Sequence, residues 1–127
     1  MRVFESGRGW ESKVNFVDEE NVLVGYDISE FCCESAEWSF HSSLPGCKAN
    51  KVELSEGDLL DFRFDRGFFV QGNLATSEEL FEGDAVAFRI VSPVREAFIV
   101  LRNSQNGYYS HGFEMSVGGV MLRRGSL

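Results

Sequence analysis

The chain is poor in proline and basic residues and has no long hydrophobic run, and each shortage excludes a class of structure or function. Only two prolines occur, Pro45 and Pro93, and both fall between stretches that we predict to be strands, where proline is tolerated. No run approaches the ~18 apolar residues of a membrane span, so we expect no contact with a membrane. Residues 1–16 lack a continuous apolar core, so the sequence predicts no signal peptide.

Basic side chains are outnumbered, with 12 lysines and arginines against 20 aspartates and glutamates, for a net charge of -8. Nonspecific nucleic-acid binding needs basic side chains that neutralise phosphates, so we expect no nucleic-acid partner. The acidity instead favours solubility.

Cysteine is also scarce, and the three residues cannot all be paired. Cys32 and Cys33 are adjacent, a geometry that disfavours a disulfide between them. An odd cysteine count without a signal peptide predicts a reducing, cytoplasmic location. At 127 residues with 43% hydrophobic residues, residues 1–127 are expected to form one domain that needs no disulfide or metal for stability.

Alternation of apolar and polar residues with a period of two is the dominant pattern. This period predicts strands, because successive side chains of a strand leave opposite faces of a sheet. No long helical pattern interrupts these runs. We therefore predict an all-β fold, an antiparallel β-sandwich or flattened barrel with one or two short helical turns. The clearest alternating stretches are 60–64, 86–90, 97–101 and 109–115.

The N-terminal half is predicted to begin with a hairpin of residues 10–17 and 22–26, joined by an acidic turn. Residues 28–37 fit either a short helix or an irregular strand. Residues 37–41 are predicted to be extended, with Trp38 and Phe40 on one face. Residues 42–50 are predicted to form a loop.

An internal echo relates residues 55–64 to residues 81–90, which share Glu-Gly-Asp followed three residues later by Phe-Arg. We interpret it as a repeated turn at a strand entry, with a duplicated pair of equivalent strands as the alternative. After the first copy, residues 65–67 predict a tight turn, with residues 68–71 pairing back. Residues 77–81 have the spacing of a capping box and predict one helical turn.

The C-terminal third predicts a β-meander. Residues 96–102 are apolar on both faces, which predicts a central strand. Asn106-Gly107 is a strong hairpin signal that would pair this strand with residues 108–115. Gly118-Gly119 predicts a second turn into residues 120–123.

The sequence contains no clear motif for a metal site or for a catalytic nucleophile. Cys32, Cys33, His41 and Cys47 offer soft ligands, but adjacent cysteines do not have the spacing of a zinc knuckle. We therefore predict no metal site and no cofactor, with the cysteines acting as small hydrophobic residues. The short acidic runs lack the alternating ligand pattern of a calcium loop, and we interpret them as solvated turns.

The ligand-binding candidates are aromatic residues and one histidine. His111 shares a predicted apolar face with Tyr109, Phe113 and Met115, where it is either a hydrogen-bonded core residue or part of a pocket floor. Tyr108 lies on the opposite face. Exposed aromatic rings could also form a sugar-binding platform, for which the sequence offers Trp10, Trp38, Tyr26, Tyr108 and Tyr109.

No catalytic or phosphate-binding motif is legible, so we predict a small non-enzymatic binding or interaction domain for an unknown small molecule or protein. Its predicted ligand-binding residues are His111, Tyr109, Tyr108 and Trp38. The alternative is an enzyme with a small-ligand pocket around His111, Tyr109 and Cys32 or Cys33. Exposed sheet edges further predict a homodimer, because two-fold dimers are the commonest closed assemblies.

Overall fold

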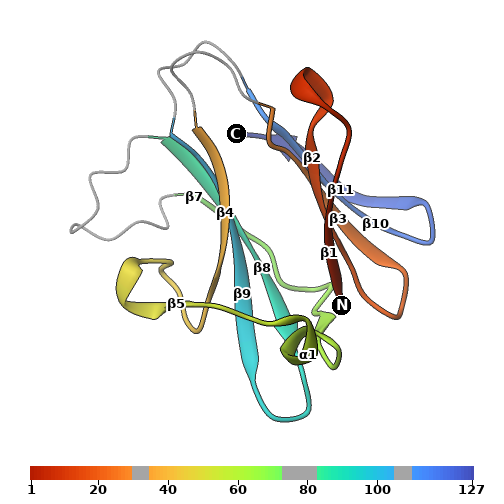
Figure 1. The fold of residues 1–127 in the computed structure, drawn as a ribbon, viewed down its shortest axis with the longest axis vertical. Coiled ribbons are helices and arrows are strands. Elements are labelled where there is room, and N and C mark those ends of the chain that lie inside the picture. The colour runs from red at the N-terminus through yellow and green to blue at the C-terminus, as the bar shows by residue number, and fades with distance from the viewer. Residues whose placement is uncertain (30–34, 73–82, 105–109) are drawn as a thin grey trace.

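Two antiparallel sheets pack face to face in the computed structural model, which describes residues 1–29, 35–72, 83–104 and 110–127 (Figure 1). One sheet has five strands in the order β1-β2-β3-β10-β11. The other has six, in the order β5-β4-β9-β8-β6, with β7 also paired to β8. The predicted all-β sandwich is therefore confirmed.

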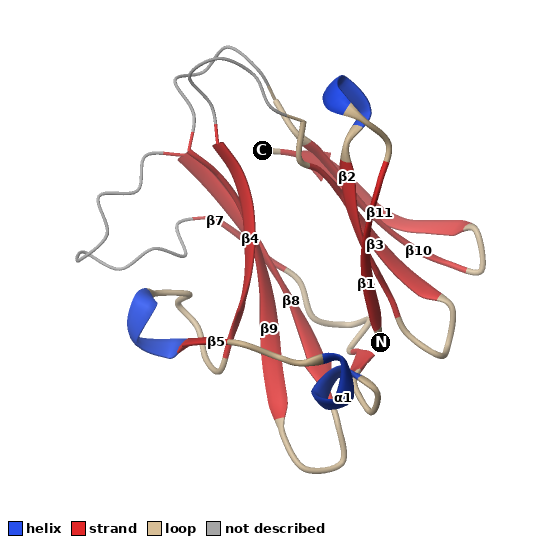
Figure 2. Ribbon diagram, viewed as in Figure 1, coloured by secondary structure: helices blue, strands red, loops and turns tan. Residues whose placement is uncertain are grey.

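Figure 2 shows that strands and loops dominate the described chain. The five-stranded sheet contains β1 (Arg2–Ser6), β2 (Lys13–Val17), β3 (Val22–Asp27), β10 (Gly112–Val117) and β11 (Val120–Ser126). The six-stranded sheet contains β4 (Ser35–His41), β5 (Lys51–Val52), β6 (Arg63–Phe64), β7 (Val70–Gly72), β8 (Gly83–Val91) and β9 (Glu96–Ser104). Short helical turns within the described ranges connect them: η1 (Gly9–Glu11), η2 (Lys48–Asn50) and α1 (Glu56–Leu59). None of the described helices is long and apolar enough to cross a membrane.

The core lies between the sheets and is rich in aromatic rings. Phe88 on β8 packs against Phe64, Phe69 and Phe113, with ring centroids 5.5 to 6.4 Å apart. Such tilted and edge-to-face pairs stabilise a core beyond the area that they bury. The inward faces follow the period-two pattern, and the following residues on them are fully buried: Val14, Phe16, Val24, Tyr26, Ile90, Ile99, Leu101 and Met115.

The predicted first hairpin is confirmed, although its first strand begins later than expected. β2 and β3 pair antiparallel, with Val14 opposite Tyr26 and Phe16 opposite Val24. Trp10 does not belong to this strand, because residues 9–11 form the helical turn η1. The edge strand β1, which pairs with β2, was not predicted from the sequence. Of residues 28–37, the last three begin β4, while 30–34 lie outside the described residues.

The two copies of the internal echo do not form equivalent structures, so both interpretations of it were wrong. In the first copy, Ser55 caps α1: its hydroxyl accepts from the Asp58 N–H at 3.1 Å, and its own N–H donates to the Asp58 carboxylate at 3.0 Å. The second copy carries Phe81 in the place of Ser55, and its residues 83–91 form the long strand β8. The capping hydroxyl of Ser55 is therefore one sequence difference between the two copies. In the first copy only residues 63–64 are strand.

Residues 68–71 do not pair back on residues 60–64, contrary to the prediction. β6 and β7 both pair with β8, at Ile90–Val91 and at Ala85–Ala87. The Asp65 N–H donates to the Arg89 carbonyl at 2.9 Å, so pairing with β8 continues beyond β6 before the chain leaves it. Residues 66–69 therefore form a detour within one interrupted edge strand rather than a reversal. The helical turn predicted for 77–81 lies outside the described residues.

β9 is central, as predicted, but the predicted meander was wrong. β4 and β8 occupy the two edges of β9, so it has no edge left for the next strand. β10 lies in the other sheet, between β3 and β11. The Asn106-Gly107 turn lies outside the described residues. The final turn at Gly118-Gly119 is confirmed, since β10 and β11 pair antiparallel.

Candidate functional site

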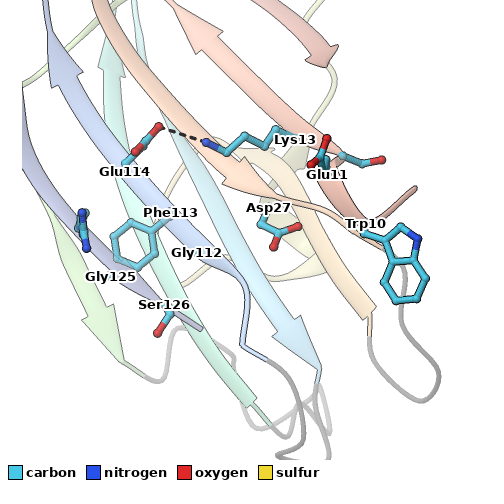
Figure 3. A pocket seen from close by; sticks show the side chains of 11 residues that line it. Trp10, Glu11, Lys13, Asp27, Gly112, Phe113, Glu114, Gly125 and Ser126 are labelled. Carbon is cyan, nitrogen blue, oxygen red and sulfur yellow. Dashed lines mark hydrogen bonds and ion pairs between the residues drawn. The ribbon is translucent and has the colours of Figure 1, made fainter. Parts of the chain in front are cut away.

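A groove of about 680 Å³ runs over the outer face of the five-stranded sheet, away from the core (Figure 3). We call it the Trp10 groove. It collects side chains from five elements or their flanks: η1, β2, β3, β10 and β11. Its lining residues are Trp10, Glu11, Ser12, Lys13, Asp27, Gly112, Phe113, Glu114, Arg124, Gly125 and Ser126.

Trp10 stands at one end of the groove because of the turn that carries it. Gly7 and Gly9 adopt positive φ angles of 77° and 56°, a conformation that L side chains rarely adopt. A Cβ at Gly7 would lie 2.0 Å from the Glu11 carbonyl oxygen, so the turn also requires the missing side chain. The Trp10 carbonyl accepts the Ser29 hydroxyl at 2.6 Å, which anchors the main chain. The indole is nevertheless 80% exposed.

Away from Trp10, the groove carries an ion pair that spans a strand (Figure 3). Lys13 on β2 and Glu114 on β10 lie on opposite sides of β3, and their charged atoms are 3.2 Å apart. Gly25 of β3 is the residue opposite Glu114, and a Cβ there would meet the Glu114 side chain at 3.7 Å. This is an ordinary contact distance, so the pair closes over β3 directly above the glycine. Figure 3 shows this contact crossing the groove.

Asp27 lies beside this pair, opposite Lys13 in the register of β2 and β3. Its Oδ1 accepts the N–H of Ser29 at 2.8 Å and shares the single proton of the Ser29 hydroxyl with the Trp10 carbonyl. These bonds fix the orientation of the carboxylate, while its side chain remains 30% exposed. Asp27 is thus an ordered acceptor that lines the groove.

His111 lies behind this wall in the interior. It is 0% exposed, and its Nδ1 is 3.0 Å from the Asp27 carbonyl oxygen. A carbonyl can only accept, so Nδ1 carries the proton. The His111 main chain also exchanges two hydrogen bonds with Leu127. Phe113 and Met115 are buried with it, as the predicted apolar face requires. This position favours the structural interpretation of His111 over a pocket floor.

Of the other predicted site residues, the structure describes Trp38, which lines a cavity that does not include His111. Trp38 is half-buried and packs edge-on against Phe16 and Phe40, at 5.1 and 5.4 Å between ring centroids. It lines a different, mainly apolar cavity of about 490 Å³ near β1 and α1. Tyr108, Tyr109, Cys32 and Cys33 lie outside the described residues.

The described residues contain no group of three or more histidine, cysteine, aspartate or glutamate side chains that could hold a metal. Both ring nitrogens of His41 already have partners: Nε2 lies 2.7 Å from the Ser39 hydroxyl and Nδ1 lies 2.8 Å from the Asn50 amide oxygen. Cys47 is a free cysteine that precedes η2. Its main-chain N–H donates to the same Asn50 oxygen. These contacts build the loop that follows β4.

Trp10 was among the aromatic candidates predicted from the sequence, but it was expected in a strand. The missed signal was the pair of glycines at positions 7 and 9, which favours a turn over a strand. Lys13, Asp27 and Glu114 were not predicted at all, because only strand pairing brings them together. No family model, curated protein or solved structure matches the chain.

Proposed function

We propose that this protein is a non-enzymatic binding domain and that the Trp10 groove is its ligand site. One observation carries the proposal: an exposed indole and a set of ordered charged side chains line the same concave surface. Ligand sites combine apolar contact area with a few precisely placed polar groups, and this groove offers both. The proposed ligand is a small molecule with polar groups.

Stability alone does not account for the arrangement. The side chains of Lys13 and Glu114 are 41% and 35% exposed, and ion pairs this accessible contribute little to folding. A large exposed tryptophan likewise gains nothing for the core, although it is the kind of side chain that dominates binding energies. Features that contribute little to stability yet are held in place support a role in recognition.

The enzyme alternative around His111 has weaker support. A general acid or base must reach the proton that it transfers, directly or through one water molecule. His111 is fully buried, and its Nδ1 is hydrogen-bonded to the Asp27 carbonyl.

We also propose a cytoplasmic location, which the free Cys47 and the odd number of cysteines favour.

The two tryptophans provide a direct test of the binding site. Trp38→Phe leaves Trp10 as the only fluorophore of this kind, and Trp10→Phe leaves only Trp38. Both variants would be titrated with a panel of sugars, amino acids, nucleotides and choline at millimolar concentration. We expect at least one compound to change the emission of the Trp38→Phe variant in a saturable way and to leave that of Trp10→Phe unchanged. A panel without any saturable change at Trp10 would refute the proposed site.

A further inference from the structure

We propose that the ligand class of the Trp10 groove is an uncharged carbohydrate. One sugar unit of an oligosaccharide would lie against the Trp10 indole, and hydroxyl groups of this and the neighbouring units would bond to Asp27 and to the Lys13–Glu114 pair. This inference rests on the proposed binding function and deepens it. It follows from three properties of the groove: its aromatic end, its paired donor and acceptor, and its nearly balanced charge.

The aromatic end suits a ligand that is both apolar and polar. A pyranose ring presents C–H groups on its faces and hydroxyl groups around its rim. The Trp10 indole is a flat apolar ring system, and the residue as a whole is 80% exposed. The polar side chains Lys13, Asp27 and Glu114 line the same groove and could meet such hydroxyl groups.

The ion pair supplies a donor and an acceptor side by side. The Lys13 ammonium and a Glu114 carboxylate oxygen are 3.2 Å apart. Neighbouring hydroxyls of a sugar can each donate and accept, so one can donate to Glu114 while the next accepts from Lys13. Hydrogen bonds to ionised groups are roughly twice as strong as those between neutral groups. Asp27, held by Ser29, adds a second ordered acceptor.

The balance of charge disfavours ionic ligands. The carboxylates of Glu11, Asp27 and Glu114 would repel a phosphate or another anion. Lys13 and Arg124 would oppose a compact cation such as choline. An uncharged polyhydroxyl compound meets neither repulsion and can use donors and acceptors of both kinds.

Gly112 gives a way to block the groove without disturbing the fold. It lines the groove, and a Cβ there would meet nothing closer than the Gly125 carbonyl oxygen at 3.8 Å. Its φ is not positive and it lies in β10, where valine is a favoured residue. Gly112→Val should therefore fill the groove while the protein remains folded.

The test titrates the Trp38→Phe protein with α- and β-linked oligosaccharides of glucose, mannose, xylose and N-acetylglucosamine. Choline chloride and inorganic phosphate serve as charged comparison probes. We expect saturable binding of at least one oligosaccharide and of neither charged probe. Trp10→Ala and Gly112→Val, measured by calorimetry, should each lower that affinity by roughly tenfold or more, since stacking and access are both required. Val94→Ala is the control, because Val94 is 89% exposed and lies outside the groove.

The outcomes separate this inference from the proposed function. Saturable binding of choline or phosphate at Trp10, without any oligosaccharide, would refute the carbohydrate and leave the binding domain intact. No saturable change at Trp10 with these probes or with the amino acids and nucleotides of the wider panel would refute both. Oligosaccharide binding that survives both Trp10→Ala and Gly112→Val would show that the sugar binds elsewhere, and would overturn the inference.

Discussion

The carboxylate of Asp18 joins the two sheets, because its Oδ2 accepts the main-chain N–H of Phe64 at 2.9 Å. Asp18 follows β2 in the five-stranded sheet, whereas Phe64 belongs to β6 in the six-stranded sheet. The other oxygen, Oδ1, accepts the N–H groups of Glu20 and Val22 at 2.9 and 3.0 Å and so closes the turn before β3. Asp18 is only 4% exposed, which corrects the prediction that residues 18–20 form a merely solvated turn.

Asp18→Ala should therefore destabilise the domain. The substitution would leave two buried N–H donors, on Val22 and Phe64, without their acceptor. Hydrogen bonds to charged groups contribute about 1.5–3 kcal/mol each, so we expect a loss on the order of 3 kcal/mol in the free energy of unfolding. Urea denaturation measures this loss. Glu19→Ala, at the exposed neighbouring position, is the control and should change little. Equal effects of the two substitutions would contradict the bridging role of Asp18.

Gly46 and Gly57 form a second matched pair. A Cβ at Gly46 would lie 2.9 Å from Val100 Cγ2 and 3.2 Å from the His41 ring, so Gly46→Ala should destabilise by about 1–3 kcal/mol. Gly57 lies within α1, and a Cβ there would meet the Ser55 hydroxyl at an ordinary contact distance of 3.7 Å, so Gly57→Ala should stabilise by about 0.5–1 kcal/mol. Thermal unfolding should shift in opposite directions for the two variants. A Gly46→Ala variant that is not destabilised would mean that the loop after β4 is not packed against the sheet.

The sequence predicts the inward faces of the strands well, because burial follows a local period of two. Val14 and Phe16 are examples, and so is the doubly buried segment of β9. Pairing between strands is less predictable, since it depends on which edges are already occupied. The alternation around Asn106-Gly107 suggests a hairpin, yet β4 and β8 already cover both edges of β9. Local signals carry no information about such competition.

The candidate site depends even more on non-local pairing. Lys13 and Glu114 are 101 positions apart in the sequence, and they meet only because β3 lies between β2 and β10. Neither residue belongs to a motif. The sequence identified Trp10 as an aromatic candidate, but it did not predict the exposure of this residue, which depends on the glycine turn at positions 7 and 9. The sequence indicated His111 as a site candidate. In the structure its ring is buried, and its Nδ1 is hydrogen-bonded to the Asp27 carbonyl oxygen.

Asp58 predicts a dependence of stability on pH. Hydrogen bonds with Ser55 lower the pKa of Asp58 below its ordinary value of 3.8. The bond from the main-chain N–H of Ser55 has the larger effect and the bond with its hydroxyl the smaller one. A carboxyl whose pKa is lowered by folding stabilises the protein above that ordinary value and loses this contribution as the pH falls through the folded-state pKa. Asp58→Asn should therefore lower the melting temperature at pH 7, and the difference from wild type should shrink toward pH 3. A difference that is constant over this range would contradict the assignment. Asp61→Asn, at an exposed position outside the capping box, is the comparison.

The absence of a bound metal also remains a prediction. His41 would have to lose its contacts with Ser39 and Asn50 to ligate an ion, and Cys47 lies in the same loop. We expect the protein, purified without chelators, to contain far less than one zinc per chain by elemental analysis. One equivalent of zinc that is lost in a Cys47→Ser variant would contradict this prediction.

The last prediction concerns self-association through β11. This strand forms one edge of the five-stranded sheet, and three consecutive residues on it, Val120, Met121 and Leu122, are exposed. Charge attraction between residues 18–20 and the two arginines of β11 has little support, because Glu20 pairs with Arg63 and Arg66 within the chain.

An apolar edge strand instead favours antiparallel pairing with the same strand of a second copy, which a two-fold axis permits. We therefore expect light scattering at high protein concentration to give twice the monomer mass of 14.3 kDa. Met121→Lys should restore the monomer, because a charge at the centre of the pairing would be buried without a partner. Val94→Lys, which changes an exposed apolar residue elsewhere, should leave the dimer intact. A wild-type mass of 14.3 kDa would reject the homodimer, and a dimer that survives Met121→Lys would place the interface away from β11.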